Sequence, residues 1–159
     1  MDTSALKNLK NYVFGSTAAI LTNVSLIVGL GSARAGRGPI LGSLLTIAVA
    51  DNISDSLGIH LYNEAERCEK KFTVLATALN FASRLLVSLS FVAIVLIFSI
   101  ARAIPVAIVW GLLLLTLLSY IITKSNQENS LREIAKHVLV AVIVIALSRV
   151  VGTLIVERF

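Results

Sequence analysis

Two carboxylates interrupt an apolar stretch of the chain, IAVADNISDSLGIH, in which Asp51 and Asp55 lie four residues apart. On a helix this spacing puts both side chains on one face, with about 6 Å of rise between them. Carboxylate oxygens are ligands for hard and borderline divalent cations. The pair therefore predicts a cation-binding site, which the amide oxygen of Asn52 or Asn23 would complete.

More acidic residues lie further along the same helix. The face that carries the aspartates continues through Tyr62 to Glu66 and Glu69, and His60 forms a second four-residue pair with Glu64. An imidazole ligand would suit iron, manganese or zinc. We expect the glutamates to concentrate cations at the mouth of a path, with His60 as a further ligand.

A structural role for the aspartates is the alternative. Arg84 and Arg149 also lie within apolar segments, and charges inside a membrane usually pair with one another. If the arginines neutralise Asp51 and Asp55, the four residues form a lock between helices and not a cation site. The residues alone leave both interpretations open.

The elements that must position these residues are membrane-spanning helices. Hydrophobic residues make up 57% of the chain and charged residues 14%, and the mean hydropathy is strongly positive. This composition indicates a polytopic membrane protein. A helix needs about 20 apolar residues to cross the hydrocarbon core, and it satisfies its backbone groups internally. We predict an all-α membrane protein, one domain over residues 1–159, with five transmembrane helices at 12–32, 39–61, 73–100, 103–123 and 134–156.

Charges in the connections predict the orientation. The side of the N-terminus carries Lys7, Lys10, Arg67, Lys70, Lys71, Lys124, Arg132 and Lys136, whereas the other side carries only Arg34, Arg37, Arg102 and Arg158. The positive-inside rule then places the N-terminus in the cytoplasm and the C-terminus outside or in a lumen. We expect a multi-pass protein of the plasma membrane in a prokaryote or of an organelle membrane in a eukaryote.

Several classes of function do not fit this sequence. The net charge of +5 is not arranged as a basic stripe with interleaved aromatic residues, so we expect no nucleic-acid partner. His60 and His137 lie near opposite ends of separate helices, and no nucleophile–base spacing or phosphate loop occurs. We therefore expect no enzymatic activity and no permanently bound cofactor.

Small residues recur every four positions along two of the spans. The second span carries Gly42, Thr46, Ala50, Ser54 and Gly58, and the first carries Ala18, Thr22, Ser25, Gly29 and Ala33. Such stripes let helix backbones approach closely in lipid. We expect the two stripes to pack against each other or across a homodimer.

With the helices placed in this way, the chain resembles the vacuolar iron transporter family. The segment GSTAAILTNVSLIVGLGSARAG is similar to the family's first helix, with matches at Thr22, Leu26, Gly29 and Ala33. The segment AVADNISDSLGIHLYNEAER is similar to its second helix, with matches at Ala50, Ser54 and Gly58. The segment SLREIAKHVLVAVIVIALSRVVGTLI fits its final helix. The resemblance covers nearly the whole chain and implies five helices with the N-terminus inside.

The resemblance implies export of Fe²⁺ or Mn²⁺ from the cytoplasm, in exchange for protons, through a homodimer whose first two helices line the path. This chain departs from the family at three places. Ala18 stands where the first helix carries an acidic residue, and Asp55 stands where the second carries a methionine. The cytoplasmic metal-binding insert is reduced to the short segment around Glu64, Glu66 and Glu69.

These departures are those expected if the acidic ligand has moved from the first helix to the second. In a symmetric dimer Asp51 and Asp55 would be doubled, and four carboxylates near one axis would attract divalent cations and also hold protons. We predict a short, insert-lacking member of this family, a homodimer in the lipid bilayer that exports Fe²⁺ or Mn²⁺. The alternative is a non-transporting scaffold or interaction protein of the same fold, with the aspartates paired to Arg84 and Arg149.

Overall fold

The computed structural model describes residues 3–126 and 130–158, and within these ranges every regular element is a helix. The elements are α1 (Thr3–Ser32), α2 (Arg37–Thr46), η1 (Ile47–Asp51), α3 (Asn52–Ala65), α4 (Lys70–Ile97), α5 (Ile100–Asn126) and α6 (Ser130–Arg158). Five helical segments are long and apolar enough to cross a membrane, and α2, η1 and α3 together form the second of them. The prediction of an all-α protein with five such segments is confirmed in length and composition.

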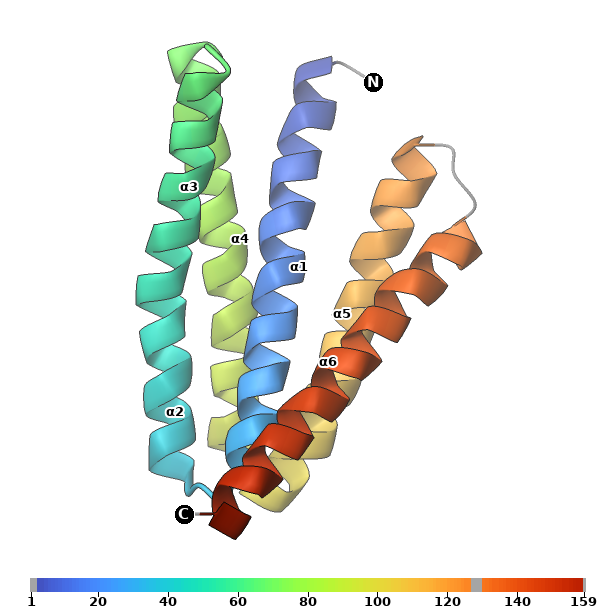
Figure 1. The fold of residues 1–159 in the computed structure, drawn as a ribbon. Coiled ribbons are helices and arrows are strands. Elements are labelled where there is room, and N and C mark those ends of the chain that lie inside the picture. Colours follow the sequence, from blue (N-terminus) through green and yellow to red (C-terminus); the bar gives the residue numbers. More distant parts are fainter. Residues whose placement is uncertain (1–2, 127–129, 159) are drawn as a thin grey trace.

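Helix α1 lies at the centre of the bundle. It contacts α2, α4, α5 and α6, while α3 packs along α4 and α6 packs along α5. Figure 1 shows α3 and α4 on one side of α1, and α5 and α6 on the other. The start of α1 and the α3–α4 turn lie at one end of the molecule, and the α1–α2 turn and the end of α6 lie at the other. Side chains of α1 can therefore reach both halves of the bundle.

The apolar core fills the space between α1 and its neighbours. Ile20 of α1, Leu44 of α2 and Phe91 of α4 are each almost fully buried in one cluster. Helix α6, in contrast, exposes many of its apolar side chains, including Leu139 and Leu147. Exposed apolar side chains on so hydrophobic a helix suit contact with lipid, because lipid tails are as apolar as the side chains themselves.

The helix boundaries differ from the predicted ones. Helix α4 ends at Ile97 and α5 begins at Ile100, so the chain turns before Arg102, which lies between the predicted spans 73–100 and 103–123. Phe98 has an extended backbone (φ −98°, ψ 153°), and Arg37 donates a hydrogen bond from Nη2 to its carbonyl at 2.9 Å. A basic side chain at this position satisfies a carbonyl at the end of α4. At most other ends the helices extend beyond the predicted spans.

An arginine with a left-handed backbone conformation follows two of the helices. Arg67 follows α3 with φ of 53°, and Arg34 follows α1 with φ of 57°. After α3, the N–H of Cys68 donates to the carbonyl of Asn63 at 3.0 Å, which is the long bond of a Schellman motif. Glycine is the usual residue at this position because it has no Cβ to clash. Both turns are therefore sharp, and both arginines adopt a backbone that side chains disfavour.

The second span differs from the single regular α-helix that the sequence predicts. Residues Ile47–Asp51 form a π-helical turn between α2 and α3, which inserts one extra residue and rotates α3 about the helix axis. On a regular α-helix, positions four apart drift by about 40° per step. The π turn offsets part of that drift. It therefore keeps the small residues of the span, from Gly42 to Gly58, on one exposed side of the bundle.

Candidate functional site

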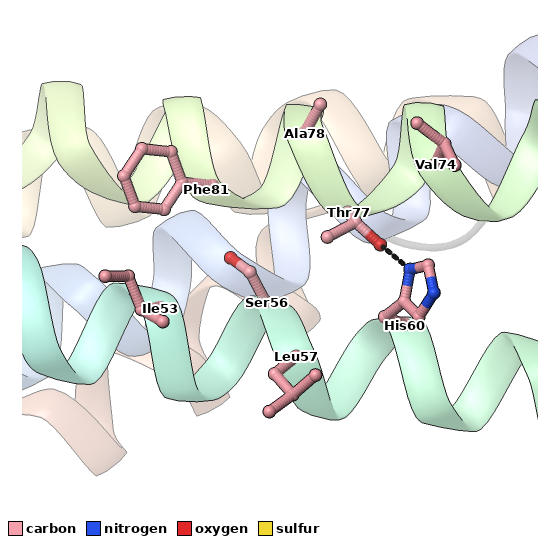
Figure 2. Close-up of a pocket in the computed structure, with 8 residues that line it drawn as sticks. All are labelled: Ile53, Ser56, Leu57, His60, Val74, Thr77, Ala78 and Phe81. Atoms are coloured by element: carbon pink, nitrogen blue, oxygen red, sulfur yellow. Dashed lines mark hydrogen bonds between the residues drawn. The ribbon is translucent and has the colours of Figure 1, made fainter.

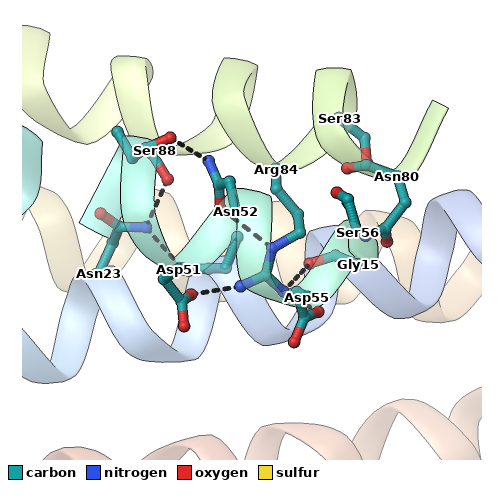
Figure 3. Close-up of polar contacts among 12 residues, drawn as sticks. Gly15, Asn23, Asp51, Asn52, Asp55, Ser56, Asn80, Ser83, Arg84 and Ser88 are labelled. Carbon is teal, nitrogen blue, oxygen red and sulfur yellow. Dashed lines mark hydrogen bonds and ion pairs between the residues drawn. The ribbon is translucent and has the colours of Figure 1, made fainter. Parts of the chain in front are cut away.

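The polar centre of the bundle is the side chain of Arg84 on α4, which is only 1% exposed. Its Nη1 lies 2.7 Å from Oδ2 of Asp55, and its Nη2 forms an ion pair with Oδ2 of Asp51. Nε donates to Oδ1 of Asn52 at 3.0 Å, and Nη1 also donates to the carbonyl of Gly15 at 3.3 Å. Figure 3 shows the guanidinium between α1 and α3, held from both sides.

The local fold of the second span explains this geometry. Asp51 ends the π turn, and Asn52 begins α3 directly after it. The Nδ2 of Asn52 donates to the carbonyl of Ala48 at 2.8 Å, and this bond turns Oδ1 toward Arg84. Two consecutive side chains, with Asp55 one turn further along the same span, therefore converge on one guanidinium. Irregular π turns of this kind are frequent at functional sites.

The two aspartates are not buried with their partner. The side chain of Asp51 is 42% exposed and that of Asp55 is 38% exposed. In both residues it is Oδ2 that contacts Arg84, and the structure gives Oδ1 no partner among the described residues. When both carboxylates are ionised, they carry two negative charges against the single positive charge of Arg84. The cluster therefore keeps one uncompensated negative charge on the exposed side of α3.

A second layer of buried amides and hydroxyls flanks the cluster along α4. Asn80 donates from Nδ2 to Oγ of Ser56 on α3 at 3.2 Å. Asn23 on α1 donates from Nδ2 to Oγ of Ser88 at 3.0 Å. These bonds tie α4 to α3 and to α1 on either side of Arg84 (Figure 3). The Oδ1 atoms of Asn23 and Asn80 are buried without a partner among the described residues.

The predicted metal ligands are therefore only partly gathered. Asp51, Asp55 and Asn52 meet at Arg84, so the oxygen of Asn52 is already occupied. Asn23 lies at Ser88, where its amide nitrogen bonds the hydroxyl and not an aspartate. In the described part of the chain, no three acidic, histidine or cysteine side chains come close enough to hold a metal ion. Among the described residues, the two aspartates are the only predicted ligands with exposed oxygens in the cluster.

His60 lies on the same helix at a separate place. Its Nδ1 lies 3.1 Å from Oγ1 of Thr77 on α4, and its Nε2 lies 3.5 Å from Oε1 of Glu64. Figure 2 shows His60 and Thr77 beside an open groove of about 550 Å³ between α3 and α4, which has largely apolar walls. Glu66 and Glu69 are exposed around the α3–α4 turn. The acidic residues thus form an exposed group at that end of the bundle, without a closed ligand set.

Of the two arginines predicted to pair with the aspartates, Arg84 does so and Arg149 does not. Arg84 pairs with both aspartates, so the part of the lock interpretation that concerns Arg84 agrees with the structure. The prediction for Arg149 is wrong, because Arg149 is exposed on α6 and makes none of the ion pairs found among the described residues. Since α1 stands between α3 and α6, the two arginines lie in different halves of the bundle (Figure 1).

The small-residue stripes do not pack against each other within the subunit. On α1, Gly29 faces α6 instead, where a Cβ added to Gly152 would lie 2.1 Å from the carbonyl oxygen of Gly29. On the second span the stripe is exposed, and Gly42 and Gly58 have nothing within 4 Å of an added Cβ. The exposed residues of this stripe, which we call the α2–α3 small face, are Gly42, Thr46, Ala50, Ser54 and Gly58.

Sequence reasoning missed the contribution of Gly15. A Cβ on Gly15 would lie 2.0 Å from Oδ1 of Asn80 and 3.3 Å from Cγ of Arg84. Only glycine therefore lets α1 approach α4 closely enough for its carbonyl to meet the guanidinium. A glycine within a helix costs stability relative to alanine, and that cost was the available signal of a close contact at this position.

Comparison with known proteins adds no relative. No protein-family model matches the chain, and neither a curated protein nor a solved structure matches it. The resemblance to vacuolar iron transporters therefore stays a prediction from the sequence.

Proposed function

We propose that this chain is a multi-pass membrane protein that moves a divalent cation, Fe²⁺ or Mn²⁺, out of the cytoplasm as a homodimer. The observation that carries this proposal is the exposure of Asp51 and Asp55 in a helix that is long and apolar enough to span a membrane. Both carboxylates lie beside the α2–α3 small face, on which the subunit itself packs nothing.

Lipid solvates a charged side chain poorly. An aspartate at the centre of a spanning helix costs about 2.5–3.5 kcal/mol on insertion scales. One arginine neutralises one of the two carboxylates, so a charged and half-exposed group remains. A lipid tail cannot solvate it, and therefore this side of α3 requires cover by protein or by a water-filled cavity. Small residues at four-residue spacing are suited to the close approach of another helix.

A second copy of the chain would provide that cover. Two subunits that meet at their small faces would bring four aspartates and two copies of Arg84 near one axis. The total charge of this group is then minus two when all four carboxylates are ionised, which one divalent cation or two protons would balance. This balance supports an exchange of a divalent cation for protons at the interface. Glu64, Glu66 and Glu69, exposed around the α3–α4 turn, would attract cations at the predicted cytoplasmic end.

The second candidate function is a scaffold or interaction protein in which the Arg84 cluster only fixes the helices. The observation that favours it is that all three nitrogens of the guanidinium have partners, from α1 and from the second span. Breaking such a cluster would weaken the fold whether or not a cation passes. Transport and folding must therefore be measured separately.

Uptake of Mn²⁺ and Fe²⁺ into proteoliposomes tests the proposal. We expect wild-type protein to move the cation and Asp51→Asn and Asp55→Asn to reduce uptake to the level of protein-free liposomes. Glu157→Gln, which removes an exposed carboxylate at the far end of α6, is the matched control and should transport normally. Each variant is first shown to be folded by its helical circular dichroism. Equal uptake by wild type and both aspartate variants, or no uptake by any, would leave the scaffold function as the better account.

A further inference from the structure

Arg149 is a charge within a spanning helix that the proposed function does not use. It lies about two and a half turns before Arg158, where α6 ends, and it is exposed. Arg84, the other arginine in the middle of a span, has two carboxylate partners, whereas Arg149 has none among the described residues. A guanidinium at such a depth needs an anionic partner, or its side chain must extend to the membrane surface.

A groove of about 490 Å³ lies beside Arg149, between α1, α5 and α6. It exists because α6 crosses α1 at two glycines, Gly29 and Gly152, and the helices diverge from that point. Figure 1 shows this crossing near the end of the bundle where α1 finishes. The volume is within the usual range of about 300–1,000 Å³ for ligand pockets.

One part of the groove wall is polar, and the other part is apolar. Arg149 of α6 and Ser32 of α1 give it a polar part, toward the end of the bundle where α1 ends. Ile108 of α5 and Val142 of α6 line the part that leads toward the middle of the bundle. A molecule that fits this shape has an anionic head and an apolar tail.

The charge of this end of the molecule is strongly positive. The exposed arginines here, besides Arg149, are Arg34, Arg37, Arg102 and Arg158, whereas Glu157 is the one acidic residue among the described residues at this end. Arginine matches the geometry of phosphate better than lysine does, because its planar fork donates two parallel hydrogen bonds. The surroundings of the groove therefore favour a phosphate group over a carboxylate of the protein itself.

We propose that this groove binds an anionic phospholipid, with the phosphate at Arg149 and one acyl chain along the apolar walls between α5 and α6. The lipid supplies the counter-charge that Arg149 lacks within the subunit. This site is separate from the Arg84 cluster, and its occupancy does not depend on whether the protein transports a cation.

Native mass spectrometry of the detergent-purified full chain tests this site, with phosphatidylglycerol and phosphatidylcholine added in turn. We expect wild type to retain phosphatidylglycerol over phosphatidylcholine, and Arg149→Gln to bind phosphatidylglycerol roughly tenfold more weakly, since a charge-assisted bond of about 1.5 kcal/mol corresponds to that ratio. Arg102→Gln removes an exposed arginine that does not line the groove, and should bind as wild type does. Arg149→Lys keeps the charge and should lose less affinity than Arg149→Gln.

A second pair of variants tests the groove without changing charge. Ala146 lines the groove, whereas Ala135 is exposed on the same helix outside it. Ala146→Leu should weaken retention of phosphatidylglycerol, and Ala135→Leu should not. Retention of phosphatidylglycerol by Arg149→Gln and Ala146→Leu at wild-type level would overturn the proposal. So would equal retention of phosphatidylcholine, or retention of inorganic phosphate as strong as that of phosphatidylglycerol.

Discussion

Arg84 is buried in a span, and a buried guanidinium is stable only when its donors and its charge have partners. Asp51 and Asp55 supply the charge, and Asn52 and Gly15 supply further acceptors. Removing one member of such a group is costly because the others are left uncompensated, whereas removing all of the charges together is much less so. The energetic role of the cluster is therefore testable by comparing single and combined substitutions.

We expect Arg84→Gln to lower the free energy of unfolding by roughly 3–5 kcal/mol, because it leaves two carboxylates without a counter-charge. The combined variant Asp51→Asn, Asp55→Asn, Arg84→Gln should recover most of that loss. Reversible unfolding in mixed detergent micelles measures both. If the combined variant is as unstable as Arg84→Gln alone, uncompensated charge is not the source of the loss.

Gly15 allows α1 to approach α4, and a methyl group there would meet Oδ1 of Asn80 at 2.0 Å. We expect Gly15→Ala to destabilise the protein by about 1–3 kcal/mol, as overpacking does in a core. Gly38→Ala is the control, because Gly38 lies in α2 with nothing within 4 Å of an added Cβ. That control should be neutral or slightly stabilising in the same unfolding measurement. Equal stability of the two variants would contradict a close contact at Gly15.

Sequence reasoning identified the charged residues of the cluster but not its geometry. Asp51, Asp55 and Arg84 are recognisable because charges in apolar segments are rare and costly. Which arginine meets the aspartates depends on which helix packs beside the second span, and apolar stretches with little contrast between their faces do not specify that neighbour. The choice between Arg84 and Arg149 therefore required the structure.

The π turn at Ile47–Asp51 sets the rotation of α2 relative to α3. Its sequence, IAVAD, contains neither proline nor glycine, so the residue types do not predict a π turn. The turn lets Ile40 and Leu44 of α2 stay fully buried while Asn52 of α3 faces Arg84. A regular α-helix would rotate one of these groups away by about 100°.

Deleting Val49 should convert the π turn into regular α-helix. We expect this deletion to lower the melting temperature strongly, because either the apolar contacts of α2 or the ion pairs of Arg84 must then be lost. Val49→Ala is the matched control, since Val49 is 57% exposed, and it should melt close to wild type. Thermal unfolding followed by circular dichroism compares the two. A deletion variant that melts like wild type would show that the π turn is dispensable.

The turn after α3 is a place where a substitution should stabilise the protein. Arg67 has φ of 53°, a conformation that costs roughly 1 kcal/mol for a residue with a Cβ and little for glycine. Arg67→Gly should therefore stabilise the protein by about 0.5–1 kcal/mol. Arg67→Ala removes the same charge but keeps the Cβ, so it should bring no such gain. Chemical unfolding of the two variants separates the backbone effect from that of charge.

The helix bundle exposes two surfaces of different chemical character. Helix α6 exposes apolar side chains such as Leu147 and Val151, which lipid can cover. The α2–α3 small face lies beside two half-exposed carboxylates, which lipid cannot cover well. The two surfaces thus require different surroundings, and only the second requires protein or water.

This difference makes the proposed homodimer testable by a single substitution. Gly58 has nothing within 4 Å of an added Cβ, so Gly58→Leu should leave the isolated subunit folded. A second copy packed on this face would meet the new side chain, and the dimer should then dissociate to monomers at concentrations where wild type is dimeric. Ala93→Leu enlarges an exposed alanine of α4 outside the small face and should not change the oligomeric state. Light scattering during size-exclusion chromatography measures both masses. A wild-type monomer, or a Gly58→Leu dimer as stable as wild type, would remove this face as the interface, and the carboxylates would then have to face a water-filled cavity.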